Sequence, residues 1–153
     1  MRVVSLVPSL TQTLFDLGLT TEEVVGRTPW CIHPKEKVEQ VMVIGGTKTP
    51  NLNKIRSLKP DLIVMDREEN PLEIYQTLAN EGYTIFVSEV ESAQDVPKML
   101  RELGKACNRE SAGEQLALLC EDSLDQIPKV GNGLRTVPLI WYEPLMAVGP
   151  NKY

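Results

Sequence analysis

Short apolar runs alternate with longer amphipathic stretches along the N-terminal part of the chain. The apolar runs are rich in β-branched residues and have the length of buried strands, and apolar residues at helical spacing follow them. The expected strands cover residues 3–7, 24–28, 41–44, 61–65 and 84–87. Strands that alternate with helices in this way predict βαβ units, and therefore an α/β fold with a mostly parallel sheet.

The helices between these strands have recognisable end signals. We expect them at residues 10–17, 35–40, 52–58 and 71–81. Ser9 and Asn51 are good N-cap residues for the first and third helices, because their side-chain oxygens can accept hydrogen bonds from free N–H groups in the first turn. Gly18 and Gly82 are expected to end the first and last helices, since glycine readily adopts the left-handed backbone conformation found there.

The pattern changes after residue 91. Two helices without intervening strand signals are expected at residues 93–107 and 110–127, and a new strand at residues 136–142. The chain ends at Tyr153, before we expect that strand to acquire a partner. An unpaired strand edge readily pairs with another chain. We therefore expect either part of a two-lobed protein or a homodimer formed through the incomplete second lobe.

Composition and charge exclude several classes of function. The chain has 153 residues, enough for one well-buried core, and its 42% hydrophobic and 24% charged residues are usual for a globular protein. Its net charge of −5, without a basic stripe, argues against nucleic acid and anionic membranes as main partners. No apolar stretch approaches the roughly 20 residues that a membrane-spanning helix needs.

The N-terminus and the cysteines bear on the cellular location. A strand pattern begins directly after Arg2, without a charged leader and long apolar core. We therefore expect a cytoplasmic protein as encoded, or a periplasmic or cell-surface protein if a leader was removed. The three cysteines, an odd number, do not predict a disulfide framework, so reduced thiols are the simpler interpretation.

Ligands of open α/β sheets bind outside the carboxyl ends of the strands, so the loops at residues 8–9, 28–34, 45–51 and 66–70 carry the candidate chemistry. The second loop contains Cys31 and His33, the only histidine of the chain. These two residues could ligate a metal, but a stable site needs three or four ligands. Alternatively, Cys31 packs under the loop, or His33 contacts a ligand directly.

The other loops leave similar alternatives open. Gly46 permits close backbone approach, and Lys48 could hold a carboxylate or amide, although a tight turn with a solvated lysine fits equally well. Residues 66–70, including Glu69, form either a binding loop or a solvated turn. Trp141 and Met146 offer apolar surface to a large ligand, or else close over a core.

Several of these segments together resemble the helical-backbone, cobalamin-type substrate-binding proteins of ABC importers (class III), a family that includes siderophore and haem receptors. The matching segments are residues 2–14, 25–28, 45–46, 51–55, 58–63 and 70–87. The resemblance implies two α/β lobes joined by a long helix, with the ligand between them. On that template residues 1–91 are the N-terminal ligand-binding lobe, residues 92–130 contain the interlobe helix, and residues 131–153 begin a truncated second lobe.

The resemblance further implies a non-catalytic protein that binds cobalamin or a related metal chelate, requires no cofactor and serves an ABC permease. The ligand-contacting residues would be Ser9, Trp30, His33, Gly46, Lys48, Glu69, Trp141 and Met146, with His33 as a candidate axial metal ligand. Two other interpretations remain: a cytoplasmic metal-dependent enzyme that uses Cys31 and His33, and an interaction module without ligand binding.

Overall fold

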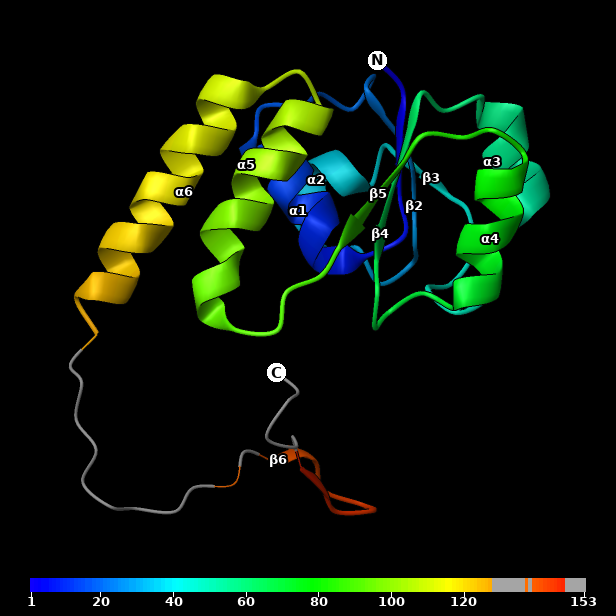
Figure 1. Cartoon of the computed structure of the whole chain (residues 1–153). Helices are drawn as coiled ribbons and strands as arrows, with labels where there is room; N and C mark the ends of the chain where they lie inside the picture. The colour runs from blue at the N-terminus through cyan, green and yellow to red at the C-terminus, as the bar shows by residue number, and fades with distance from the viewer. Residues whose placement is uncertain (128–136, 138, 148–153) are drawn as a thin grey trace.

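The computed structural model describes residues 1–127, 137 and 139–147. Five parallel strands form one sheet, with the order β3-β2-β1-β4-β5 (Figure 1). The strands are β1 (Val3–Ser5), β2 (Val24–Arg27), β3 (Met42–Val43), β4 (Leu62–Asp66) and β5 (Ile85–Ser88). Each lies within a few residues of a predicted strand, and the parallel α/β fold is confirmed.

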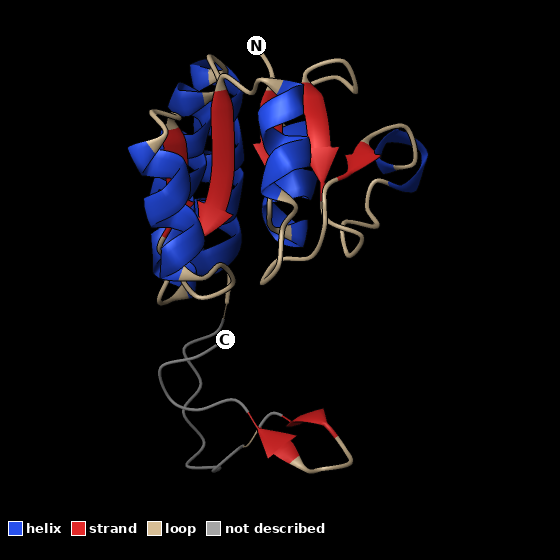
Figure 2. Ribbon diagram, turned by 90° about the vertical axis from the view of Figure 1, so that its right-hand side faces the viewer, coloured by secondary structure: helices blue, strands red, loops and turns tan. Residues whose placement is uncertain are grey.

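Helices cover both faces of this sheet (Figure 2). Helices α3 and α4 lie on one side, α1 and α5 lie on the other, and α6 lies outside α5 (Figure 1). The helices are α1 (Pro8–Asp16), α2 (Lys35–Val38), α3 (Leu52–Leu58), α4 (Leu72–Asn80), α5 (Val96–Ala106) and α6 (Glu110–Asp125), and the short 3₁₀ helix η1 (Ala93–Asp95) precedes α5. No described helix has the length and apolar character that crossing a membrane would require.

The sheet separates two hydrophobic cores. Successive residues of a strand point to opposite faces, so Val3 packs in the core under α1 and α5, while Val4 packs in the core under α3 and α4. The same alternation runs along β4, where Val64 belongs to the first core and Ile63 to the second. Burial on both faces explains why these strands read as continuous apolar runs.

The predicted helix ends are confirmed with one exception. Asn51 caps α3, since its Oδ1 accepts a hydrogen bond from the backbone N–H of Lys54 at 3.0 Å. Gly18 and Gly82 follow α1 and α4 with φ angles of 88° and 86°. The prediction that Ser9 caps α1 was wrong: the helix begins at Pro8, whose fixed φ suits a first helical position, and Ser9 lies inside the first turn.

The C-terminal strand also differs from the prediction. Strand β6 (Leu139–Trp141) was expected without a partner, but it pairs antiparallel with β7 (Met146–Ala147) in a separate two-stranded sheet. Residues 142–145 form the turn that reverses the chain, so the partner comes from only a few residues further along. Residues 128–136, 138 and 148–153, which include part of the expected strand, lie outside the described part of the chain. The three-part division stays a prediction.

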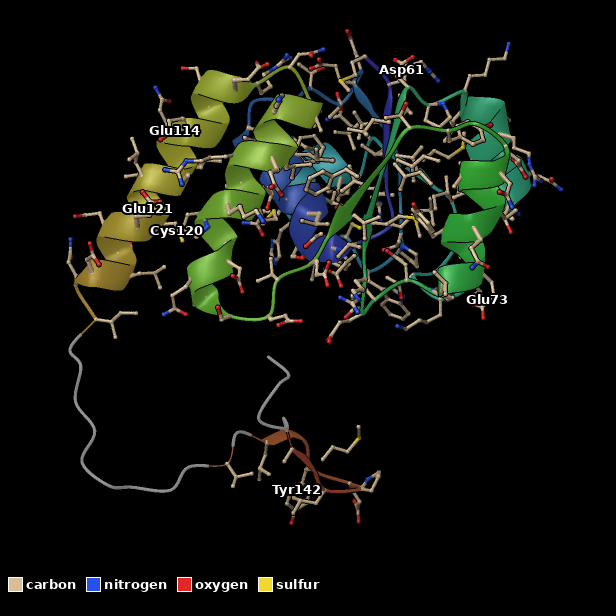
Figure 3. All side chains as sticks on the ribbon, in the orientation of Figure 1. Asp61, Glu73, Glu114, Cys120, Glu121 and Tyr142 are labelled. Carbon is tan, nitrogen blue, oxygen red and sulfur yellow. The ribbon has the colours of Figure 1, made fainter. Side chains whose placement is uncertain are left out.

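Helices α5 and α6 pack closely because glycines meet at their contact. A Cβ atom placed on Gly104 would lie 2.8 Å from the Cα of Gly113 and 3.0 Å from the carbonyl oxygen of Arg109. Arg101 of α5 also pairs with two carboxylates of α6, with Nε–Oε2 and Nη1–Oε1 distances of 2.7 Å to Glu114 and Glu121 (Figure 3). Close backbone contact and this ion-pair network together fix how the two helices pack.

The close contact predicts that alanine in place of Gly104 destabilises the protein, although helix propensity alone would predict stabilisation. Alanine normally stabilises a helix relative to glycine by about 1 kcal/mol. For Gly104→Ala we expect a net loss of about 1–3 kcal/mol in the free energy of unfolding, because backbone atoms must move to admit the methyl group. Gly46→Ala is the matched control, since its Cβ would meet its nearest neighbour at 3.5 Å. Urea denaturation measures both, and a stabilised Gly104→Ala protein would contradict the expected packing.

The ion-pair network predicts a pH dependence of stability. Hydrogen bonds from Arg101 lower the pKa values of Glu114 and Glu121 in the folded protein. Their contribution is therefore complete above the usual glutamate range and is lost as the pH falls through the lowered pKa values. Arg101→Gln should lower the melting temperature near pH 7. The melting temperature of this variant should then fall less than that of the wild type as the pH is lowered to about 3. Lys98→Gln, which removes a longer 3.8 Å pair with Glu102, is the control, and parallel pH profiles for wild type and Arg101→Gln would contradict this role.

Candidate functional site

The candidate site lies at the topological switch point of the sheet, where the strand order reverses. From central β1 the chain adds β2 and β3 on one side, and then β4 and β5 on the other. Loops that follow β1 and β4 diverge at such a point and leave a crevice at the carboxyl ends of the strands. A hollow of about 350 Å³ is present there. It is lined by Val7, Ser9, Thr13, Asp66, Glu68, Glu69, Val90, Val96, Met99 and Leu100.

This hollow combines a polar and an apolar wall. The residues from α5 and the segment before it, Val90, Val96, Met99 and Leu100, are apolar, whereas the loop after β4 supplies carboxylates. Of the predicted ligand contacts, Ser9 and Glu69 both line it. The sequence pattern did not predict the apolar wall, because Val96, Met99 and Leu100 follow an ordinary amphipathic pattern that predicts only burial.

The loop after β4 is held by its own side chains. The Oδ1 atom of Asp66 accepts hydrogen bonds from the backbone N–H groups of Glu68 at 2.9 Å and Glu69 at 3.1 Å. Arg67 forms an ion pair with Glu89, which follows β5. The buried Asn70 connects the same loop to its neighbours through its side chain. This segment therefore contains buried, hydrogen-bonded polar groups, so it is not a simple solvated turn.

The loop after β3 has a tight turn at its start. Gly45 has a φ angle of 107°, and an added Cβ would lie 2.8 Å from the backbone nitrogen of Asn51, so only glycine fits there. Lys48 does not simply extend into solvent: its Nζ donates a hydrogen bond to the carbonyl oxygen of Glu68 at 2.7 Å. Gly46 lies beside Trp30, whose Nε1 would be 4.0 Å from a Cβ at that position. These loops therefore contact one another.

Cys31 and His33 have different environments. Cys31 is buried, and its Sγ lies 3.0 Å from Thr11 Oγ1 and 3.2 Å from Thr28 Oγ1, in agreement with the interpretation that it packs under the loop. His33 is exposed, and it borders a second hollow together with Arg27, Glu39 and Cys31 itself. Within the described residues, no group of three or more His, Cys, Asp or Glu side chains could hold a metal. The metal assignment to Cys31 and His33 stays a prediction without a third ligand.

The remaining predicted contacts include two exposed side chains, those of Trp30 and Met146. Trp30 is 65% exposed, which leaves its indole available to a ligand. Trp141 and Met146 are cross-strand neighbours in the β6–β7 hairpin, and the Met146 side chain is exposed. Tyr142, in the turn between them, is 83% exposed (Figure 3). Ligand contact by these residues stays a prediction.

A doubly wound α/β lobe with polar loops gathered at the carboxyl ends of its strands is the architecture of a small-molecule binding lobe. The chain belongs to the periplasmic binding protein family, whose sequence profile matches residues 3–149. Within that family it is a class III protein, as the sequence resemblance implied. This is a family of substrate-binding proteins, which are not enzymes.

Individual relatives support this assignment. The vitamin B12-binding protein of Pectobacterium carotovorum subsp. carotovorum (strain PC1) is 31% identical over 140 residues, which are 90% of this chain and 49% of that protein. The uncharacterized ABC transporter substrate-binding lipoprotein YvrC of Bacillus subtilis (strain 168) is 33% identical over 131 residues, 82% of this chain and 40% of the relative. The chain thus spans about half the length of these curated relatives.

Solved structures show the same fold. The periplasmic vitamin B12-binding protein BtuF of Vibrio cholerae superimposes with a TM-score of 0.85 at 21% identity, over 99% of this chain and 60% of the other. The periplasmic haem-binding protein RhuT of Roseiflexus sp. RS-1 gives a TM-score of 0.79 at 23% identity, over 98% and 59% of the two chains. The fold is therefore shared by receptors for different chelates, so the fold alone does not select a ligand.

The environments of the cysteines predict their reactivity. Cys31 and Cys107 are 1% exposed, and burial raises the pKa of Cys107 to about 11, whereas Cys120 on α6 is half-buried (Figure 3). We expect only Cys120 to react quickly with Ellman's reagent in the native protein, because thiolate formation and access both control the rate. Cys120→Ser should abolish the fast phase. A fast phase that persists in this variant would contradict the buried positions of Cys31 and Cys107.

Proposed function

We propose that this chain is the N-terminal lobe and linking helix of a substrate-binding protein for cobalamin or a related metal chelate, of the type that serves ABC importers. The observation that carries the proposal is the hollow between the loops after β1 and β4, with one apolar and one carboxylate-rich wall. A corrinoid has an extended apolar ring and peripheral amides whose N–H groups can donate to carboxylates, so its face and its edge match the two walls. The named B12-binding and haem-binding relatives support this ligand class.

In this proposal the predicted contacts divide by chemistry. Trp30, Trp141 and Met146 provide apolar surface for the ring. Ser9 and Lys48 donate hydrogen bonds to peripheral amides or carboxylates, and Glu69 accepts them from amide N–H groups. Gly46 admits the ligand close to the backbone. His33 is a candidate axial ligand to the metal of the chelate, which is cargo and not a cofactor of the protein. Because binding is the whole activity, no residue has a catalytic role.

The proposal also has a cellular context. Relatives are named as periplasmic proteins or as a lipoprotein of an ABC transporter, which supports a periplasmic or cell-surface location and an ABC permease as the partner. The ligand would lie between this lobe and a second one, with residues 131–153 leading into that lobe. A homodimer through the same region is the alternative arrangement.

A thermal-shift assay tests the ligand class. Cyanocobalamin, cobinamide, haemin, a ferric siderophore and divalent metal salts would each be added to the protein. We expect one chelate to raise the melting temperature, since a ligand at 100 times its Kd stabilises the folded state by about 2.7 kcal/mol. Glu69→Gln should reduce that shift, because its carboxylate lines the hollow. Glu73→Gln, an exposed position in the first turn of α4, should leave it unchanged (Figure 3).

The other outcomes discriminate the alternatives. Stabilisation by a divalent metal salt alone would support the metal site at Cys31 and His33. Absence of any shift would contradict chelate binding by this chain and favour an interaction module. If Glu69→Gln and Glu73→Gln reduced the ligand-induced rise in melting temperature equally, the placement of the ligand in this hollow would be contradicted.

A further inference from the structure

The side chain of Asn70 lies where three loops of the carboxyl edge meet. It is 6% exposed. Its Oδ1 accepts a hydrogen bond from the backbone N–H of Asp66 at 2.8 Å, at the end of β4. Its Nδ2 donates to the carbonyl oxygen of Thr47 at 3.0 Å, in the loop after β3, and to that of Leu6 at 3.3 Å, in the loop after β1.

The partners of Asn70 fix both the residue type and its orientation. An N–H group can only donate and a carbonyl oxygen can only accept, so the amide has a single orientation that satisfies all three groups. A carboxylate at this position would face the oxygens of Leu6 and Thr47 without a proton to share. An apolar side chain would leave the N–H group of Asp66 and the carbonyl groups of Leu6 and Thr47 without this partner. Asparagine is therefore specifically required by the geometry.

We propose that Asn70 is the positioning residue of the binding face, holding the loops after β1, β3 and β4 in one fixed arrangement; this rests on the proposed function of that face. Two of these loops carry predicted ligand contacts, since Lys48 directly follows Thr47 and Glu69 directly precedes Asn70. The loop after β1 leads into α1, which carries Ser9. The hydrogen bond from Lys48 to the carbonyl of Glu68 is a second link between two of the same loops. A face organised before the ligand arrives loses less conformational entropy on binding.

This role differs from a purely structural one in its consequences. Leu6 and Thr47 are 64 and 23 residues from Asn70 in the sequence, so its side chain links loops that the chain itself does not hold together. The two hydrophobic cores consist of other side chains, on either side of the sheet. Loss of the Asn70 amide should therefore loosen the loops while the sheet and the helices remain folded.

Hydrogen–deuterium exchange of Asn70→Asp tests the link without any ligand. We expect the backbone amides of residues 45–49 and 51 to exchange about tenfold faster than in the wild type, because local opening becomes easier, while those of β1 and β4 stay protected. Asn80→Asp makes the same chemical change at an exposed position at the end of α4 and should retain wild-type rates. Unchanged exchange at residues 45–51 in Asn70→Asp would overturn the proposal.

Binding of cyanocobalamin, measured by titration calorimetry, is the second readout. We expect the Kd of Asn70→Asp to rise about tenfold through lost pre-organisation, with Asn80→Asp unaffected; an unchanged Kd would overturn the role in binding. If the wild type does not bind this probe, the proposed ligand fails, and the exchange result still decides the link between the loops. Should Asn70→Asp not fold, Asn70→Ala removes the hydrogen bonds without adding charge and takes its place in both measurements.

Discussion

Burial of β1 between two cores is the constraint on which the rest of the structure depends. Val3, Val4 and Ser5 are fully buried, and the strand pairs with β2 on one side and β4 on the other. Because Val3 and Val4 belong to opposite cores, a shift of one residue would exchange the two faces of the strand. The register of β1 therefore determines where the neighbouring strands end, and with them the loops of the candidate site.

The buried polar groups at the carboxyl ends of the strands hydrogen-bond to one another and to the backbone. Asp66 accepts hydrogen bonds from two N–H groups of its own loop, Asn70 connects three loops, and Cys31 lies between two threonine hydroxyls. Among the described residues, no buried side-chain nitrogen or oxygen lacks a hydrogen-bond partner. Such satisfied networks stabilise one arrangement over its alternatives. These hydrogen bonds thus hold the loops of the candidate site in one arrangement at the end of the sheet.

Close backbone contact and ion pairs hold the last two helices, α5 and α6, together. Helices α5 and α6 approach each other through Gly104 and Gly113, and an ion-pair network centred on Arg101 lies beside that contact. The outer side of α6 exposes Leu118 and Leu119 at 53% and 65%. A helix that is fixed firmly to one lobe is suited to carry a second lobe at a constant position. This is consistent with the linking role that the family resemblance implies.

The sequence by itself determined the parallel α/β lobe, the cap at Asn51 and the family, because these depend on local periodicity, local hydrogen bonds and the order of matching segments. It did not reveal that Asn70 is buried, that Lys48 contacts Glu68, or that Cys31 is buried while the nearby His33 is exposed. A run of polar residues looks the same whether it is solvated or holds loops together, since its partners are distant in sequence. Only the tertiary structure brings those partners into contact, and it therefore decided which polar residues organise the site.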